Sequence, residues 1–301
     1  MNTLHVIFFL YLCKLQFIET MKSISELQDI ASQVRRDIIR MTAQAQSGHP
    51  GGSLGCTDFL TALYFNVMNV EPNRFKMSAE GEDVFFLSNG HISPVFYSIL
   101  ARRGYFPTSE LGTFRKLDSR LQGHPSITHN LPGVRMASGS LGQGLSVAIG
   151  TALTKKLNND PSIVYCLCGD GELQEGQNWE AMMFASAKHV NNLIAVVDDN
   201  GLQIDGATKD VCDLGDLRAK FEAFGWQVLD MDGHNMENIL STLDEAKKKL
   251  ANKKPVFIVM KTEMGHGVDF MTNNCKFHGA VTNAEQTENA LSQLKETLGD
   301  Y

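Results

Sequence analysis

The segment from residue 163 to residue 206 constrains the fold more than any other part of this sequence. It holds two apolar runs of strand character, Ile163–Leu167 and Leu193–Val197, with a helix-compatible stretch between them. The first run is followed by the turn Gly169–Gly171, and the second ends at the polar turn Asp198–Gly201. This order of strand, turn, helix, strand and turn predicts a βαβ unit of a parallel sheet.

The rest of the chain continues the alternation of strands and helices. Helices are predicted from an N-cap at Ser25 to about Ala45 and over residues 57–68, 93–103, 145–157, 214–224, 235–252 and 282–298, and strands over residues 83–88, 226–230 and 255–261. Residues 47–52 are predicted to form a rigid loop that holds His49 in a cleft, and residues 104–135 a long polar loop. The pattern as a whole predicts an α/β fold, with a mostly parallel sheet flanked by helices.

Asp170 and Asn200 fall just beyond the ends of the two central strands, where open α/β sheets bind ligands. Their side-chain oxygens are hard donors suited to Mg²⁺ or Ca²⁺, and such an ion can also hold a phosphate. The flanking residues Gly169 and Gly171 let the backbone approach a diphosphate closely. Gly-Asp-Gly alone is also an ordinary turn, but Asn-Gly at the end of the next strand favours a metal and diphosphate site.

Composition and charge limit the classes of partner. A hydrophobic content of 43% and a charged content of 20% are typical of a globular protein. The net charge of −7 argues against a nucleic-acid surface, so an anionic ligand must be attracted locally, by a metal, histidines and helix N-termini. The six cysteines show neither metal-ligand spacing nor a disulfide framework, which fits a reducing cytoplasm.

Residues 1–20 need a separate interpretation. Val6–Leu12 is apolar enough for a signal-peptide core, but no Lys or Arg precedes it and no small-residue cleavage site follows. The run is also too short and too interrupted to cross a bilayer, so no membrane association is expected. We expect residues 1–20 to be a non-native extension, with the protein beginning at Met21, or a disordered or loosely docked N-terminus. Residues 21–301 are expected to form one diphosphate-binding domain.

Four histidines lie beside glycine at predicted ends of strands or helices: His49, His91, His124 and His278. Any one of them alone could be a loop histidine without a special role. Together, beside a metal and diphosphate site, they favour proton transfer near neutral pH and hydrogen bonding to phosphate or sugar hydroxyls. His266 is near enough to the His278 loop in sequence to be of interest, but it is left unassigned.

Seven motifs in this order resemble the transketolase family: SGHPGG (Ser47–Gly52), LSNGHIS (Leu87–Ser93), QGHP (Gln122–Pro125), GSLGQGLS (Gly139–Ser146), GDGELQEG (Gly169–Gly176), DDNGLQIDG (Asp198–Gly206) and FHG (Phe277–Gly279). The resemblance implies a thiamine diphosphate-binding fold. Complete members of that family are much longer, and only their N-terminal, diphosphate-binding part is matched. The resemblance therefore implies the N-terminal subunit of a split transketolase, whose C-terminal subunit carries the pyrimidine-binding domain.

Roles can be carried over at the matching positions. The resemblance implies Mg²⁺, with Ca²⁺ as a possible substitute, bound by the side chains of Asp170 and Asn200 and the backbone carbonyl of Leu202. It implies cofactor contacts from His91, Gly139, Leu141, Gly169, Gly171, Glu172, Asn200 and His278. It implies catalytic roles near the sugar for His49, His124 and His278. Glu175 resembles the family's interface glutamate, which helps to link the cofactor sites across the dimer.

The implied activity is transfer of a two-carbon ketol unit from a ketose phosphate to an aldose phosphate, as in the pentose phosphate pathway. This enzyme would be active only with its partner subunit, in a heterotetramer. Two alternatives remain open. One is a subunit of another thiamine diphosphate enzyme, of the 2-oxoacid dehydrogenase or deoxyxylulose phosphate synthase type, against which the histidine set argues. The other is a non-catalytic cofactor-binding remnant, which would have no physical need for Asp170, Asn200 and the four histidines.

Overall fold

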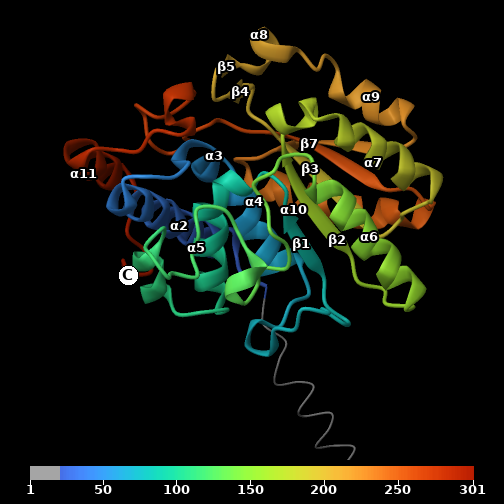
Figure 1. Ribbon diagram of the computed structural model, residues 1–301, viewed down its shortest axis with the longest axis horizontal. Coiled ribbons are helices and arrows are strands. Elements are labelled where there is room, and N and C mark those ends of the chain that lie inside the picture. Colours follow the sequence, from blue (N-terminus) through green and yellow to red (C-terminus); the bar gives the residue numbers. More distant parts are fainter. Residues whose placement is uncertain (1–20) are drawn as a thin grey trace, which may run out of the picture.

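The computed structural model describes residues 21–301, so the expectations for residues 1–20 lie outside the described part (Figure 1). Its centre is a five-stranded sheet in the order β1-β2-β3-β7-β6, in which every neighbouring pair is parallel. The strands are β1 (Val84–Leu87), β2 (Val164–Gly169), β3 (Leu193–Asp199), β6 (Gln227–Asp232) and β7 (Val256–Lys261). A small antiparallel ribbon joins β4 (Leu202–Gln203) to β5 (Gly206–Ala207). The predicted α/β fold is confirmed.

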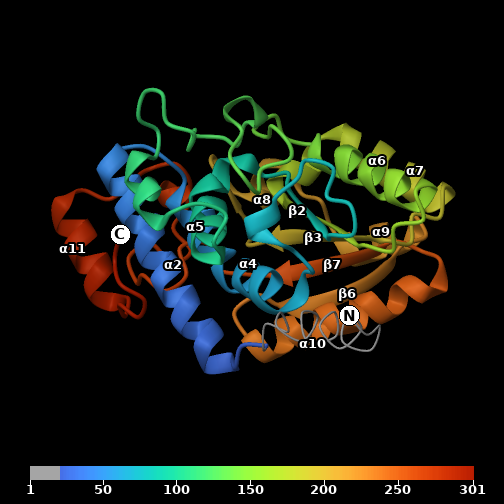
Figure 2. The same cartoon turned by 90° about the horizontal axis from the view of Figure 1, so that it is seen from below.

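Helices cover both faces of this sheet. Figure 2 shows α6 (Gly144–Leu157) and α7 (Gly176–Ala187) on one side and α10 (Met236–Lys249) on the other. The first side also carries α9 (Leu217–Ala223), and the second carries α2 (Ile24–Ala45), α4 (Thr57–Ala62) and α5 (Ser93–Arg103). Among the described residues, no helix is long and apolar enough to cross a membrane.

Strand residues alternate between two separate cores. In β2, Tyr165 and Leu167 pack with the α2, α4, α5 and α10 side, whereas Cys166 and Cys168 pack with the α6 and α7 side. This alternation follows from the two-residue period of a strand. Because both faces are covered, the central strands read as continuous apolar runs rather than as alternating patterns.

The start of α2 differs from the prediction. Its N-cap is Ser23 rather than Ser25, and Ser25 lies in the first turn. The Ser23 hydroxyl accepts from the Glu26 backbone N–H (3.3 Å), and the Glu26 carboxylate accepts from the Ser23 backbone N–H (2.7 Å). This reciprocal capping box satisfies two N–H groups at once, and it sets the first helical residue at Ile24.

Three other predicted elements need correction. The segment 47–52 is not all loop, because Pro50 opens the short helix α3 (Pro50–Gly55) directly after His49; proline favours the first helical position, where no N–H bond is needed. The predicted helix over 57–68 is α4 followed by a π-helical turn, Leu63–Val67. The predicted helix over 282–298 is only α11 (Ala284–Gln293).

Residues 104–135 contain short 3₁₀ turns, Thr108–Thr113 and Ile127–His129, and are otherwise irregular. Side chains of α5 hold this segment in place. The Tyr97 hydroxyl donates to the Gln122 carbonyl (2.8 Å), and the Ser93 hydroxyl donates to the Gly123 carbonyl (2.7 Å). The irregular segment thus presents His124 at a defined place.

The strand register brings the ends of four strands to one edge of the sheet. Leu87 of β1 is level with Leu167 of β2, and Gly169 is level with Asp198 of β3. Asp199 is in turn level with Lys261 of β7. Because the strands are parallel, the segments that follow each of them meet at this edge.

Candidate active site

A cavity of about 380 Å³ opens at this edge of the sheet. Every residue that the sequence singles out for the site lines it except His124, including the three predicted metal ligands Asp170, Asn200 and Leu202. His124 lies beside it, with its ring centre 6.2 Å from that of His49. The structure therefore brings together residues as far apart in the sequence as His49 and His278.

Asp170 lies at the floor of the cavity and is almost fully buried. One carboxylate oxygen accepts from the Gly171 N–H (2.7 Å), and the other accepts from the Gly201 N–H (2.7 Å) and the Thr208 hydroxyl (3.1 Å). Burial, together with the charge of nearby Asp198, raises the pKa of Asp170 to about 7. A buried carboxylate beside a second one is an electrostatic setting that a bound cation would relieve.

Asp198 was not singled out by the sequence, yet it orients the predicted ligand Asn200. The Asn200 amide nitrogen donates to the Asp198 carboxylate (2.7 Å), which turns the amide oxygen the other way. That oxygen accepts from the Leu202 N–H (3.0 Å) and keeps a second lone pair. Asp198 is held in turn by the Thr262 hydroxyl. The sequence signal for Asp198 is its place directly after the apolar run Leu193–Val197.

Glu172 was expected to contribute its backbone, but its side chain proves to be a structural centre. The buried carboxylate accepts from the Ser88 hydroxyl, the Gly142 N–H (2.8 Å) and the Gly169 N–H (3.0 Å). It therefore ties the ends of β1 and β2 to the loop before α6. Burial raises the pKa of Glu172, and the three donors stabilise its charged form.

The histidines form a compact cluster at the cavity. The ring centres of His91 and His278 are 5.0 Å apart and stacked, and His49 lies 5.2 Å from His91 and 5.6 Å from His278. Burial lowers the pKa of His49 to about 4, and electrostatic repulsion between its protonated form and His278, Arg115 and His124 adds to the effect; burial also lowers the pKa of His91 to about 3. Burial also lowers the pKa values of His124 and His278. All four imidazoles are therefore neutral near pH 7, and each can donate one hydrogen bond and accept another.

Two buried polar atoms of the cavity lining lack a partner among the described residues: His49 Nδ1 and Asn89 Oδ1. Ser138 Oγ, next to the lining residue Gly139, also lacks one there. A buried polar atom without a partner is costly, so these atoms indicate a polar ligand. A glycine is also required close by, because a Cβ on Gly90 would lie 2.3 Å from the Ser138 hydroxyl and 2.8 Å from the Gly139 nitrogen.

The family model described as "Transketolase, thiamine diphosphate binding domain" matches residues 27–299. This chain belongs to the transketolase family.

The named relatives agree with this assignment. The chain is 38% identical over 264 residues to one of the subunits of the apulose-4-phosphate transketolase from Phocaeicola vulgatus, covering 88% of this chain and 92% of that one. It is 37% identical over 270 residues to a 6-deoxy-6-sulfo-D-fructose transketolase subunit of a Clostridium species, and the match covers 90% of this chain and 96% of that one. The crystal structure of Campylobacter jejuni transketolase superposes with a TM-score of 0.83 at 34% identity, covering 91% of this chain. The chain spans only 43% of that enzyme.

The donor atoms that line the cavity of about 380 Å³, called the transketolase cavity below, are suited to a diphosphate and a divalent cation. Carboxylate and amide oxygens at Asp170 and Asn200 are the ligand types that Mg²⁺ takes. The neutral His91 and His278 and the Asn89 side-chain oxygen, which line this cavity, provide polar groups for a cofactor that carries phosphates and nitrogen rings.

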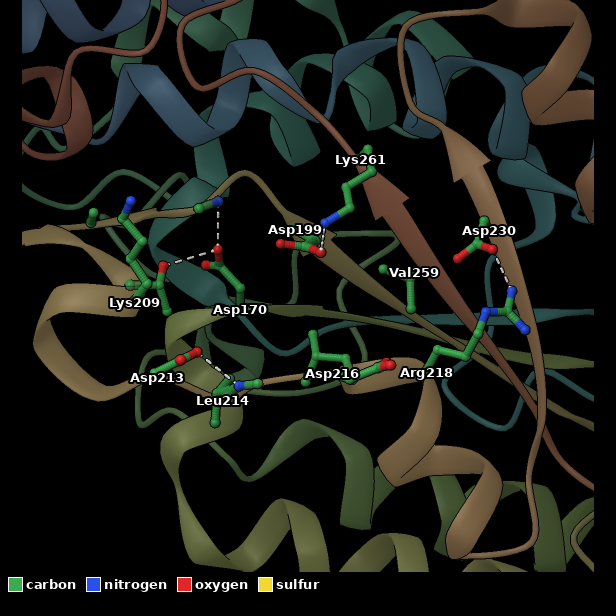
Figure 3. Close-up of a pocket in the computed structure, with 15 residues that line it drawn as sticks. Asp170, Asp199, Lys209, Asp213, Leu214, Asp216, Arg218, Asp230, Val259 and Lys261 are labelled. Carbon is green, nitrogen blue, oxygen red and sulfur yellow. Dashed lines mark hydrogen bonds and ion pairs between the residues drawn. The ribbon is translucent and has the colours of Figure 1, made fainter.

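A second cavity, of about 460 Å³, is also lined by Asp170 (Figure 3). Figure 3 shows Lys261 reaching toward Asp199 and Arg218 toward Asp230, and both pairs are in contact. Since these charged side chains neutralise each other, this cavity presents a much weaker case for an ionic ligand than the transketolase cavity does.

His266 belongs to a separate cluster with His234 and Asp58, whose potential metal-binding atoms lie within 4.8 Å of one another. The hydrogen bonds argue against a metal there. Arg35 donates to both Asp58 oxygens (3.1 and 2.6 Å), and the Glu263 N–H donates to His234 Nε2 (2.8 Å). An acceptor at Nε2 places the ring proton of neutral His234 on Nδ1, which faces Asp58 and so has no lone pair for a metal.

Proposed function

We propose that this chain is the N-terminal subunit of a two-chain transketolase that moves a two-carbon ketol unit from a ketose phosphate to an aldose phosphate. The observation that carries the proposal is the meeting of Asp170, Asn200 and a cluster of neutral histidines at one cavity. The length of the match adds support, since relatives named as single subunits are matched almost end to end while complete transketolases are matched over less than half.

In this proposal Asp170, Asn200 and the Leu202 carbonyl hold Mg²⁺, for which Ca²⁺ can substitute. His91, His278 and the backbone around Gly169, Gly171 and Glu172 face the diphosphate, and Gly139 and Leu141 border the cofactor rings. When bound, thiamine diphosphate supplies the electron sink that allows the carbon–carbon bond of the ketose to break.

The proposed roles of His49, His124 and His278 follow from their neutral state. A neutral imidazole can take a proton from one sugar hydroxyl and donate a hydrogen bond to another. His49 Nδ1 is buried and has no partner in the described part of the chain, so it is available to meet the substrate. His49 and His278 are the proposed carriers of the proton that moves as the bond breaks or forms.

The proposed partner is a C-terminal subunit that carries the pyrimidine-binding domain, in a heterotetramer. Glu175 is exposed at the rim of the cavity, where it can reach a second chain. Apolar side chains are also exposed on the adjacent helices, namely Val147 on α6 and Met183 and Phe184 on α7. Apolar exposure beside a half-open site supports cover by a partner.

The five cysteines of the described part are free. Free thiols persist where the surroundings are reducing, which supports a proposed cytoplasmic location.

Co-expression with the C-terminal subunit encoded in the same organism tests the function. The purified pair, given thiamine diphosphate and Mg²⁺, is expected to transfer a ketol unit, and the isolated chain is expected to be inactive. Donors and acceptors should include apulose 4-phosphate and 6-deoxy-6-sulfo-D-fructose besides ordinary sugar phosphates, because the names of two relatives specify these sugars. Release of CO₂ from a 2-oxoacid would favour the alternative enzyme class, and full activity of the isolated chain would refute the two-chain proposal.

A further inference from the structure

We propose that Arg115 is a positioning residue that holds His49 and His124 side by side, by fastening the Ser47–His49 loop to the Gly123–His124 turn. This inference rests on the proposed function only for its effect on catalysis. The arrangement itself is a matter of contacts within the chain, so it can be tested separately.

The first contact joins Arg115 to the loop that carries His49. Arg115 Nη1 donates to the Ser47 hydroxyl at 3.0 Å, two residues before His49. The preceding side chain, Phe114, supports the same loop, because a Cβ on Gly48 would lie 3.3 Å from the Phe114 ring. Gly48 has a φ of +138°, a conformation that other residues rarely adopt. Two consecutive side chains therefore brace the backbone directly before His49.

The second contact joins Arg115 to the turn that carries His124. A Cβ on Gly123 would lie 2.5 Å from the central carbon of the Arg115 guanidinium, so the planar group lies directly against the Gly123 backbone. The Gly123 carbonyl is also held by the Ser93 hydroxyl (2.7 Å). On its other side His124 packs on Gly139, where a Cβ would be 3.0 Å from the imidazole.

The backbone conformation of Arg115 directs its side chain toward the two histidine segments. Arg115 has a φ of +58°, an unfavourable conformation for an arginine, and its N–H donates to the Leu121 carbonyl at 2.9 Å. That hydrogen bond closes the loop between the two residues and aims the side chain inward. The Arg115 Nε atom is buried and has no partner within residues 21–301. Backbone strain together with an unsatisfied buried donor is a combination expected at a functional position.

The charge of Arg115 acts on the same two histidines. Burial is the main cause of the lowered pKa values of His49 and His124, and the guanidinium adds to it in both cases. The charged and titratable groups that face His49 are His91, His124, His278 and Arg115, all neutral or positive. Arg115 is the permanent charge among them, so it adds to burial in favouring the neutral form of both imidazoles, which proton transfer requires.

Arg120 provides a matched control in the same irregular segment. It pairs with Glu110 in a two-bonded contact of 2.8 and 2.7 Å and is more than a third exposed. Such surface pairs contribute little. Arg120→Gln is therefore expected to leave transfer and the histidines unchanged.

The test uses the two-chain complex with four variants: Arg115→Gln, Arg115→Lys, Ser47→Ala and Arg120→Gln. Hydrogen–deuterium exchange at histidine C2 positions, followed by mass spectrometry, reports the pKa of each histidine without any need for activity. Arg115→Gln is expected to raise the pKa values of His49 and His124 and to leave exchange at the distant His189 unchanged. Arg115→Lys is expected to keep both low, because the charge remains. Ser47→Ala is expected to speed exchange at His49, because its loop is released.

Catalysis gives the second readout. Arg115→Gln is expected to lower kcat/KM on the order of 10- to 100-fold, the range expected when a reacting group is misplaced, with thiamine diphosphate affinity unchanged. The acidic limb of its pH profile should move to higher pH, because a histidine of raised pKa loses its proton later. Arg115→Lys should restore that limb. Unchanged histidine exchange in Arg115→Gln and Ser47→Ala would overturn the inference. So would a loss of kcat/KM that is fully explained by a lower thermal stability of the variant. A wild-type complex without ketol transfer would refute the proposed function and leave the exchange test of Arg115 intact.

Discussion

Asn200 and Asp198 lie two residues apart at the end of β3, and the Asn200 amide donates to the buried Asp198 carboxylate at 2.7 Å. This contact decides which way the amide points. It therefore makes the metal-binding capacity of Asn200 depend on a residue that would not itself touch the metal. Groups of this kind orient ligands and commonly matter almost as much as the ligands do.

Replacing Asp198 by asparagine is expected to weaken binding of Mg²⁺ and thiamine diphosphate about 10- to 100-fold. The carboxylate accepts from both Thr262 and Asn200, whereas an amide has only one oxygen, so one donor loses its acceptor. Isothermal titration of the two-chain complex measures the effect. Asp199→Asn is the control, since Asp199 pairs with Lys261 instead. Equal affinity in Asp198→Asn and wild type would contradict the positioning role.

Removing the metal is expected to abolish cofactor binding. After treatment with EDTA, the complex should bind thiamine diphosphate poorly, because the diphosphate then faces the carboxylates of Asp170 and Asp198 without a cation between them. Mg²⁺ should restore binding, and Ca²⁺ should do so in its place. Asp170→Asn should remain weak after Mg²⁺ is added, whereas Asp230→Asn, which alters the neighbouring cavity, should recover fully. Strong binding in EDTA would disprove the metal assignment.

Glu172→Gln is expected to destabilise the fold by about 2–4 kcal/mol, as is usual when buried donors lose a charged acceptor. Three donors converge on the carboxylate, and the amide nitrogen of glutamine would itself be a donor facing them. Urea unfolding of the metal-free chain provides the measurement. Exposed Glu222, which pairs with Arg218 on the surface, is the control, and Glu222→Gln should change stability little. A loss for Glu172→Gln no larger than that of the control would argue against its role as a structural centre.

Acid should loosen the contact between the segment after α11 and helix α2. Arg36 donates to both oxygens of Asp300 (2.9 and 2.7 Å), and this pairing lowers the pKa of Asp300 to about 2. Because the folded pKa is below the unfolded one, the stabilisation is complete above about pH 4 and is lost as the pH falls toward 2. We expect Asp300→Asn to lower the free energy of unfolding by about 2 kcal/mol at pH 7, since one pKa unit corresponds to about 1.4 kcal/mol.

That difference should shrink by about half at pH 3, because part of the wild-type stabilisation is then gone. Urea unfolding at pH 7, 4 and 3 follows the change. Asp29→Asn removes an exposed pair with Lys295 of 3.5 Å and should have little effect at any pH. A difference between Asp300→Asn and wild type that does not vary with pH would show that the ion pair is not its cause.

Local sequence signals predicted the elements well where one strong signal dominated. Helix α5 has the predicted bounds, and β2, β3 and β7 lie within two residues of theirs. The prediction was wrong at Ser25, because the reciprocal capping box of Ser23 and Glu26 starts the helix at Ile24. The predicted helix over 282–298 is shorter because backbone groups of Lys295, Thr297 and Leu298 bond to side chains of α2 in place of a helical ladder. Hydrogen bonds to distant helices do not alter the hydrophobic periodicity of the local sequence, so they cannot be predicted from it.

The sequence by itself determined the α/β alternation, the turns at Asp170 and Asn200 and the four glycine-flanked histidines, because each depends on residue type and short spacing. Only the tertiary structure decided that Asp198 orients Asn200, that Glu172 joins two strand ends to a loop, and that Arg115 lies between the histidine segments. The physical reason is that a hydrogen bond between distant segments depends on where the backbone brings them. That placement comes from the register of the parallel strands and from packing on both faces of the sheet, which no single segment encodes.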